Sequence, residues 1–246
     1  MTGFFTSPRI VHRRRAVMMG QSPMSETTFL HRQWLTFRRQ VRPVVMFVAV
    51  LWGCEAVDAL LPVPWRLDQW GIQPRNPDSL PRIVVAPFLH EGFMHLASNT
   101  IPLLVLGWLV LLSGRWLFWA VLVVTGLSSG LGAWLFGSQS LHIGASGIVF
   151  GMLGFLLARG WVSRRPGWAF ISLLVALLYY GNVFNGLLPS PHVSWSSHFW
   201  GLAGGGGFAW WLYRHKGLPA PVSVTSLSGG TRLIRKSKAL LDMARR

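Results

Sequence analysis

The sequence predicts an all-α membrane protein that crosses the bilayer several times. Of its 246 residues, 51% are hydrophobic and only 12% are charged, whereas a soluble domain carries about 25% charged residues. Long apolar stretches recur along the chain, and about 20 consecutive apolar residues match the roughly 30 Å hydrocarbon core of a bilayer. The 14 tryptophans fit the aromatic belts at the two membrane–water interfaces.

Six membrane-spanning helices are expected, separated by breaks rich in Gly, Pro, Ser and Arg. The first span ends before Pro62 and Pro64, because proline cannot continue a helix. The six expected spans are residues 44–61, 95–112, 116–135, 146–158, 168–184 and 198–213. The predicted domains are a basic N-terminal tail over 1–43, a six-helix domain over 44–214 and a basic C-terminal tail over 215–246.

The net charge of +16 gathers at the two ends of the chain. Residues 1–43 hold eight of the 23 Lys and Arg residues, and residues 214–246 hold another eight. Because both segments flank apolar spans, anionic lipid headgroups are the expected partner rather than nucleic acid. A solvated tail without a lipid role is the alternative.

The charges of the loops predict the orientation. The loops at 135–145 and 185–197 contain no charged residue, whereas both tails and the 159–165 turn are rich in arginine. The positive-inside rule therefore places both termini in the cytoplasm, which agrees with an even number of spans. No cleavable signal peptide is recognisable over 1–42, so a multi-pass protein of the plasma membrane is expected.

Four polar side chains from three spans are expected at similar depth in the outer half of the bilayer. With a helical rise of about 1.5 Å per residue, Ser146 lies roughly 20 Å from the cytoplasmic edge, and His198 and Asn99 roughly 24 Å. His95 lies one turn beyond Asn99, on the same helix face. Ionisable residues inside a membrane are costly and indicate a functional site.

These side chains favour serine nucleophile chemistry. Ser146 stands at the start of a span, where unpaired backbone N–H groups can stabilise an oxyanion. His95 and Asn99 are further donors suited to that charge. Taken alone, a Gly-x-Ser-Gly stretch is more often a packing feature of membrane helices than a catalytic one. The convergence with the two histidines and the asparagine shifts the interpretation towards catalysis.

Glycines are expected to bring the serine and the histidine together. Gly147-xxx-Gly151 and Gly201-xxx-Gly205 give two spans small-residue faces, which allow close helix contact. No Asp or Glu occurs between Glu91 and Asp242. A Ser146–His198 dyad is therefore expected, with the imidazole of His198 oriented by the backbone or by packing rather than by a carboxylate.

Other intramembrane chemistries do not fit the sequence. A zinc site of the H-E-x-x-H type needs its second histidine at i+4, but Met94 stands there after His90-Glu91. An aspartyl mechanism needs two intramembrane aspartates, and only Asp58 lies in an expected span. Neither a metal nor another cofactor is expected. Three further histidines, His90, His142 and His192, are expected at the outer interface, and His142 is close enough to Ser146 to justify a substitution control.

Three motifs in this order resemble the rhomboid family of intramembrane serine proteases. They are His95-Leu-Ala-Ser-Asn99, Gly144-Ala-Ser146-Gly147 and His198-Phe-Trp-Gly201 with Gly205. The resemblance covers residues 44–213 and implies a six-helix rhomboid bundle. It implies that Ser146 is the nucleophile, His198 the general base, and His95 and Asn99 oxyanion donors with the Ser146 backbone N–H. The implied substrates are transmembrane segments of membrane proteins.

Three positions depart from the family pattern. Pro81-Arg82 stands where the family carries a Trp-Arg pair, Phe150 where many members have a tyrosine beneath the histidine, and Ser197 where an alanine is common. None removes a reacting group. A catalytically silent relative that binds membrane clients remains an alternative, and a small-solute transporter is a weaker one, because no inverted repeat is visible.

Overall fold

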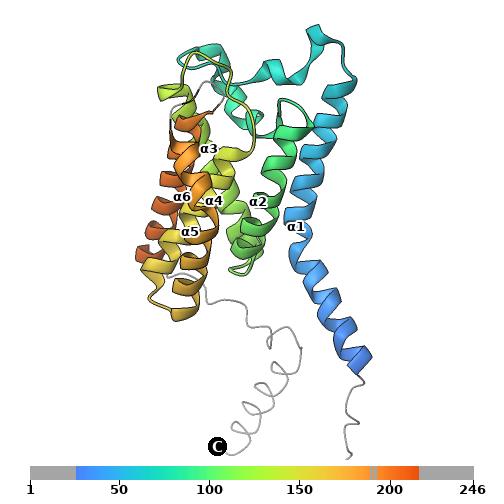
Figure 1. Ribbon diagram of the computed structural model, residues 1–246, viewed down its shortest axis with the longest axis vertical. Coiled ribbons are helices and arrows are strands. Elements are labelled where there is room, and N and C mark those ends of the chain that lie inside the picture. The colour runs from blue at the N-terminus through green and yellow to red at the C-terminus, as the bar shows by residue number, and fades with distance from the viewer. Residues whose placement is uncertain (1–25, 189, 191–192, 216–246) are drawn as a thin grey trace, which may run out of the picture. The chain divides into compact units, whose positions relative to one another are not determined.

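The computed structural model describes residues 26–188, 190 and 193–215 (Figure 1). The chain divides into two units, residues 1–35 and 36–246. In the first unit the described residues, 26–35, are helical. Most of the predicted basic tails, and His192, lie outside the described residues. The site belongs entirely to the second unit, to which the following paragraphs refer.

Six long α-helices dominate the described chain, as the sequence predicts. They are α1 Glu26–Leu60, α2 Phe93–Leu111, α3 Arg115–Phe136, α4 Ser146–Ser163, α5 Pro166–Leu187 and α6 Trp195–His215. Within this part of the chain, α1 to α4 are long and apolar enough to cross a membrane. The apolar stretch of α5 is shorter, Pro166–Gly181, and serines and glycines dilute the apolar character of α6. The protein is an all-α polytopic membrane bundle.

The first helix begins well before the expected residue 44 because Pro43 does not break it. A proline inside a helix leaves the carbonyl four residues earlier without its N–H partner. Here that carbonyl belongs to Arg39, and the guanidinium of Arg115 at the start of α3 donates to it at 2.5 Å. The freed acceptor is thus satisfied from another helix, and α1 continues through the proline.

The fourth helix runs to Ser163, five residues beyond its expected end. Arg159 is fully buried inside it, and its guanidinium lies 3.9 Å from the ring centroid of Trp168 in α5. Stacking on an aromatic face stabilises a desolvated cation. The helix ends where Arg164 adopts a left-handed conformation, with φ 49°.

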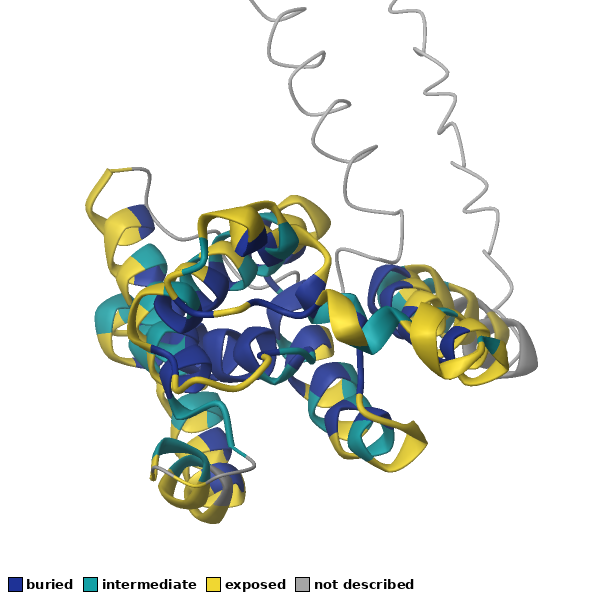
Figure 2. Ribbon diagram, turned by 90° about the horizontal axis from the view of Figure 1, so that it is seen from above, coloured by how far each residue is buried: buried dark blue, intermediate teal, exposed yellow. Residues whose placement is uncertain are grey.

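The core of the bundle is α4, which packs against α6, α3, α5 and α2. Viewed from above, the buried residues gather between the helices (Figure 2), and the first ten residues after Ser146 are all buried. The expected contact of small-residue faces is present. A Cβ added at Gly201 would overlap the carbonyl oxygen of Gly147, and one at Gly205 would overlap that of Gly151. The backbones of α4 and α6 therefore touch directly.

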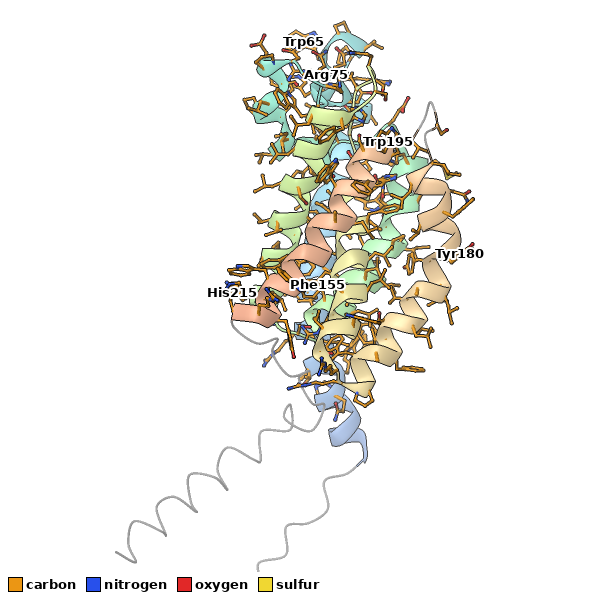
Figure 3. All side chains as sticks on the ribbon, turned by 90° about the vertical axis from the view of Figure 1, so that its left-hand side faces the viewer. Trp65, Arg75, Phe155, Tyr180, Trp195 and His215 are labelled. Atoms are coloured by element: carbon orange, nitrogen blue, oxygen red, sulfur yellow. The ribbon has the colours of Figure 1, made fainter. Side chains whose placement is uncertain are left out.

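A long loop of four short 3₁₀-helices joins α1 to α2. They are η1 Val63–Trp65, η2 Leu67–Trp70, η3 Pro77–Val84 and η4 Ala86–Phe88. The loop is fastened to α3 and the segment after it, because Arg75 donates to the Gly137 carbonyl at 3.1 Å and Trp134 Nε1 donates to the Asn76 carbonyl at 2.9 Å. Figure 3 shows Trp65 and Arg75 at the end of the bundle where α6 begins with Trp195.

Candidate active site

The first residue of α4 and the first turn of α6 meet through a hydrogen bond. Ser146 Oγ lies 2.8 Å from His198 Nε2. The other ring nitrogen of His198, Nδ1, lies 2.7 Å from the carbonyl oxygen of Gly186. Since a carbonyl can only accept, Nδ1 carries the proton and Nε2 presents its lone pair to the serine hydroxyl. The neutral imidazole is therefore held in the tautomer that can take a proton from Ser146.

The ring of Phe150, one turn after Ser146 on α4, fixes the plane of this imidazole. The rings of Phe150 and His198 are parallel, with an interplanar angle of 1° and centroids 4.2 Å apart. Contact between the two flat faces limits rotation of the histidine about χ2. Phenylalanine thus supplies the stacking surface without offering a hydroxyl.

Gly186, near the end of α5, is a site residue that the sequence analysis does not identify. A Cβ at this position would overlap the ring of Phe150 and would lie 3.2 Å from His198 Nδ1. Only glycine lets the backbone approach both rings closely enough for its carbonyl to reach the imidazole. The sequence signal is weak, because a single glycine near a helix end is common.

The two expected oxyanion donors stand together on α2. His95 Nδ1 accepts the backbone N–H of Glu91 at 3.4 Å, which leaves the proton of the neutral ring on Nε2. Asn99 Nδ2 donates to the carbonyl of His95 at 3.2 Å, so one of its two amide protons is engaged within the helix. The second amide proton and the Nε2–H of His95 remain as donors on the side of the helix that faces the cavity.

A buried histidine supports the backbone just before Ser146. His90 is 1% exposed, and its Nε2 accepts the N–H of Ala145 at 3.3 Å. Its ring meets that of His95 edge to face, with centroids 5.2 Å apart. Burial, reinforced by the neighbouring His95, lowers the pKa of His90 from 6.5 to about 4. A neutral His90 is required, because only a ring with a free lone pair at Nε2 can accept the Ala145 N–H.

All four sequence-predicted polar residues line one cavity of about 580 Å³. Its walls include the dyad, His95 and Asn99 from α2, and the segment that precedes α4. The described lining residues are Asp68, Gln69, Glu91, His95, Ser98, Asn99, Ser140, Leu141, His142, Ile143, Ser146, Val193, Ser194 and His198. Two carboxylates and no Lys or Arg are among them, so the cavity is electronegative. An extended peptide could reach Ser146 there with donors from α2 close by.

Arg82, the arginine that remains where the family carries a Trp-Arg pair, makes its contacts within the long loop. Arg82 lies over the ring of Trp70, 5.7 Å from its centroid, and donates to the carbonyl of Gly71 at 3.5 Å. Both contacts stay within the loop, so the tryptophan that the family carries before this arginine is not needed for them.

Several known proteins are similar to this sequence. The rhomboid domain matches residues 77–215, more than half of the chain. An uncharacterized protein of Mycobacterium tuberculosis is 42% identical over 173 residues, which are 66% of this chain and 70% of that protein. "Rhomboid-type serine protease 2" of Emericella nidulans is 30% identical over 118 residues, 46% of this chain and 23% of the fungal protein.

A third relative carries a different functional name. "Inactive rhomboid protein 1" of Papio anubis is 30% identical over 138 residues, 54% of this chain and 15% of that protein. Identity alone therefore does not separate active from inactive relatives. The family model spans α2 to α6 without a break; the chain belongs to the rhomboid family.

Proposed function

We propose that this protein is an intramembrane serine endopeptidase with Ser146 as nucleophile and His198 as general base. One observation carries the proposal: Ser146 Oγ lies 2.8 Å from a ring nitrogen of His198 whose lone pair is free, because the other nitrogen donates to the Gly186 carbonyl. A positioned nucleophile and base are the signature of covalent catalysis by serine.

The proposed reaction proceeds in two steps. His198 Nε2 accepts the Ser146 proton while Oγ attacks the scissile carbonyl carbon, and negative charge develops on the carbonyl oxygen. His95, Asn99 and the backbone N–H at the start of α4 stabilise that oxyanion. The imidazolium then protonates the leaving amine, and an acyl-enzyme on Ser146 remains. His198 then takes a proton from a water molecule that attacks the ester, and the imidazolium returns this proton to Ser146 Oγ as the Oγ–acyl bond breaks.

The proposed substrates are transmembrane segments of other membrane proteins. The carbonyls of a helix are hydrogen-bonded and covered, so a substrate helix must unwind locally before Ser146 can attack. A cavity of about 580 Å³ whose walls include many polar side chains offers partners for the backbone groups that unwinding releases, and it admits water for the second step. By the positive-inside rule this cavity faces the outer side of the plasma membrane, with both termini in the cytoplasm.

The test is cleavage of a tagged single-span reporter in cells. Wild type is compared with Ser146→Ala and His198→Ala at equal expression, with His215→Ala as control, a histidine at the opposite end of α6. We expect both dyad variants to lose the cleaved fragment and the control to retain it. Cleavage that persists in both dyad variants would overturn the assignment. Binding of the reporter without cleavage by wild type would instead support the silent client-binding alternative.

A further inference from the structure

A second histidine–serine hydrogen bond lies beside the dyad, and the mechanism above does not use it. His142 Nδ1 lies 2.5 Å from Ser194 Oγ, and His142 Nε2 lies 3.1 Å from the carbonyl oxygen of Ser138. Because the carbonyl only accepts, Nε2 donates to it and Nδ1 of the neutral ring accepts from the serine hydroxyl. Burial lowers the pKa of His142, which favours this neutral form at neutral pH.

The serine at the far end of this bond stands at the start of α6. The carbonyl oxygen of Ser194 accepts the backbone N–H of His198 at 3.1 Å. The Ser194 hydroxyl also donates to Ser197 Oγ at 2.8 Å, directly before His198, so its single proton is shared between His142 Nδ1 and Ser197. The side chain of His142 is therefore bonded to the helical turn that carries the proposed base. The Ser194–Ser197 hydrogen bond also gives a role to Ser197, because the alanine common at this position in the family could not form it.

The other connections of His142 lead towards the nucleophile and the long loop. Its backbone N–H and carbonyl both pair with Ile72, each at 3.0 Å. It stands four residues before Ser146 in the segment between α3 and α4. One buried residue, 3% exposed, thus joins the long loop, the segment leading to Ser146 and the first turn of α6.

We propose that His142 is a positioning residue that holds the first turn of α6 in register with Ser146. The inference rests on the proposed function, since it assigns a role toward the same dyad. His142 contacts neither reacting atom and acts only through Ser194. Without the bond, the turn bearing His198 loses one of the contacts that hold it against Ser146, and a misplacement of about 1 Å can cost on the order of 100-fold in rate.

Two conservative variants separate the contacts of the ring. The amide of asparagine reaches the place of Nδ1, so His142→Asn can keep the bond to Ser194 but not the bond to Ser138. The longer glutamine carries its amide to the place of Nε2, so His142→Gln keeps the opposite one. We expect His142→Ala and His142→Gln to lower the rate of Ser146 labelling by a fluorophosphonate probe about 10-fold or more, and His142→Asn to stay within about threefold of wild type.

Because the probe is small, its labelling rate reports the dyad rather than substrate binding. With the reporter, the loss is expected in kcat, with KM little changed. Ser194→Ala should reproduce the loss, and adding it to His142→Ala should cost little more, since both remove one bond. His215→Ala, at the other end of the helix that carries His198, is the control. Equal labelling by wild type and His142→Ala, or equal rates for the Asn and Gln variants, would overturn the proposal.

Hydrogen exchange provides a readout that does not depend on activity. Exchange of the backbone amides in residues 195–200 is expected to accelerate in His142→Ala and His142→Gln but not in His142→Asn. If wild type neither labels nor cleaves, the proposed protease function fails, while exchange still decides whether His142 holds this turn. Unchanged exchange in all three variants would refute the positioning role itself.

Discussion

The imidazole of His198 takes its orientation from a backbone carbonyl and an aromatic face. A carboxylate in that place would stabilise the imidazolium more strongly, but it would also bury a charge that costs several kcal/mol to desolvate. The Gly186 carbonyl, 2.7 Å from Nδ1, selects the required tautomer without that cost. Phe150 then fixes the ring plane. At the scale of single residues, one glycine and one phenylalanine determine the tautomer and the ring plane of His198.

Substitution of this glycine tests that arrangement. We expect Gly186→Ala to lower probe labelling of Ser146 on the order of 10-fold or more, because the added Cβ overlaps the Phe150 ring and crowds His198 Nδ1. The matched control is Gly181→Ala on the same helix, where an added Cβ meets no atom within 4 Å. That variant should label like wild type. Similar labelling by both variants would mean that the carbonyl does not orient the base.

The buried His90 predicts a loss of stability in acid. Its pKa is about 4 in the fold against 6.5 ordinarily, so between these values the unfolded chain binds a proton that the folded protein does not. The contribution of neutral His90 to the free energy of unfolding is therefore fully present above pH 6.5. It decreases by about 3 kcal/mol as the pH drops towards 4. His90→Gln can still accept from Ala145 N–H but does not titrate.

Thermal unfolding in detergent at pH 7.5 and pH 5 checks this expectation. The drop in apparent melting temperature between the two pH values should be smaller in His90→Gln than in wild type. His142, whose pKa is lowered in the same direction, should preserve part of the drop. An equal drop in both proteins would show that His90 is not the titrating group.

At the scale of helices, the contact between α4 and α6 sets the distance between nucleophile and base. We expect Gly201→Ala to lower both stability and activity, because its Cβ overlaps the Gly147 carbonyl and must force the two backbones apart. Overpacking of this kind costs about 1–3 kcal/mol. Gly207→Ala, whose Cβ meets nothing within 4 Å on the same helix, should unfold no earlier than wild type. Equal melting of the two variants would contradict the role of this contact.

The sequence predicts most helices well because their ends are marked locally. The observed ends of α2, α3, α5 and α6 fall within three residues of those expected, since Gly, Pro and Ser mark them. The start of α1 and the end of α4 are missed because distant contacts decide them. Arg115 satisfies the carbonyl freed by Pro43, and Trp168 covers Arg159. Neither partner can be identified from the helix it extends.

The same distinction holds for the site. The gathering of Ser146, His198, His95 and Asn99 at one cavity can be predicted because such side chains are unusual at their depth in a membrane. The contributions of Gly186, His90 and His142 escape prediction, since each depends on a hydrogen bond to a segment at least 12 residues away in sequence. Residue type and spacing indicate the groups proposed to react, but not the groups that hold them.

At the scale of the whole molecule, the electronegative cavity predicts a charge preference. Asp68 and Glu91 line it without any Lys or Arg among the described lining residues. We expect reporters with a Lys near the cleaved bond to have a higher kcat/KM than matched reporters with a Glu. Exposed charge pairs contribute about 0.2–1 kcal/mol, so the ratio should be about 1.4-fold to fivefold for each carboxylate and should shrink in high salt.

The double variant Asp68→Asn with Glu91→Gln should bring that ratio close to one. Asp78→Asn is the control, because this exposed carboxylate belongs to the same loop but does not line the cavity. A ratio unchanged in the double variant, or lowered equally by the control, would show that the two carboxylates do not select substrates.

The carbonyl of Gly186 determines the stage of membrane insertion at which the proposed active site is complete. Ser146 stands on α4, His198 on α6, and the acceptor for His198 Nδ1 on α5, so three separately inserted helices must be assembled before the imidazole is set. A chain that has inserted only as far as α4 holds an ordinary alcohol. The proposed protease activity would therefore arise only when α6 docks, and a partly inserted chain would not cleave other membrane proteins.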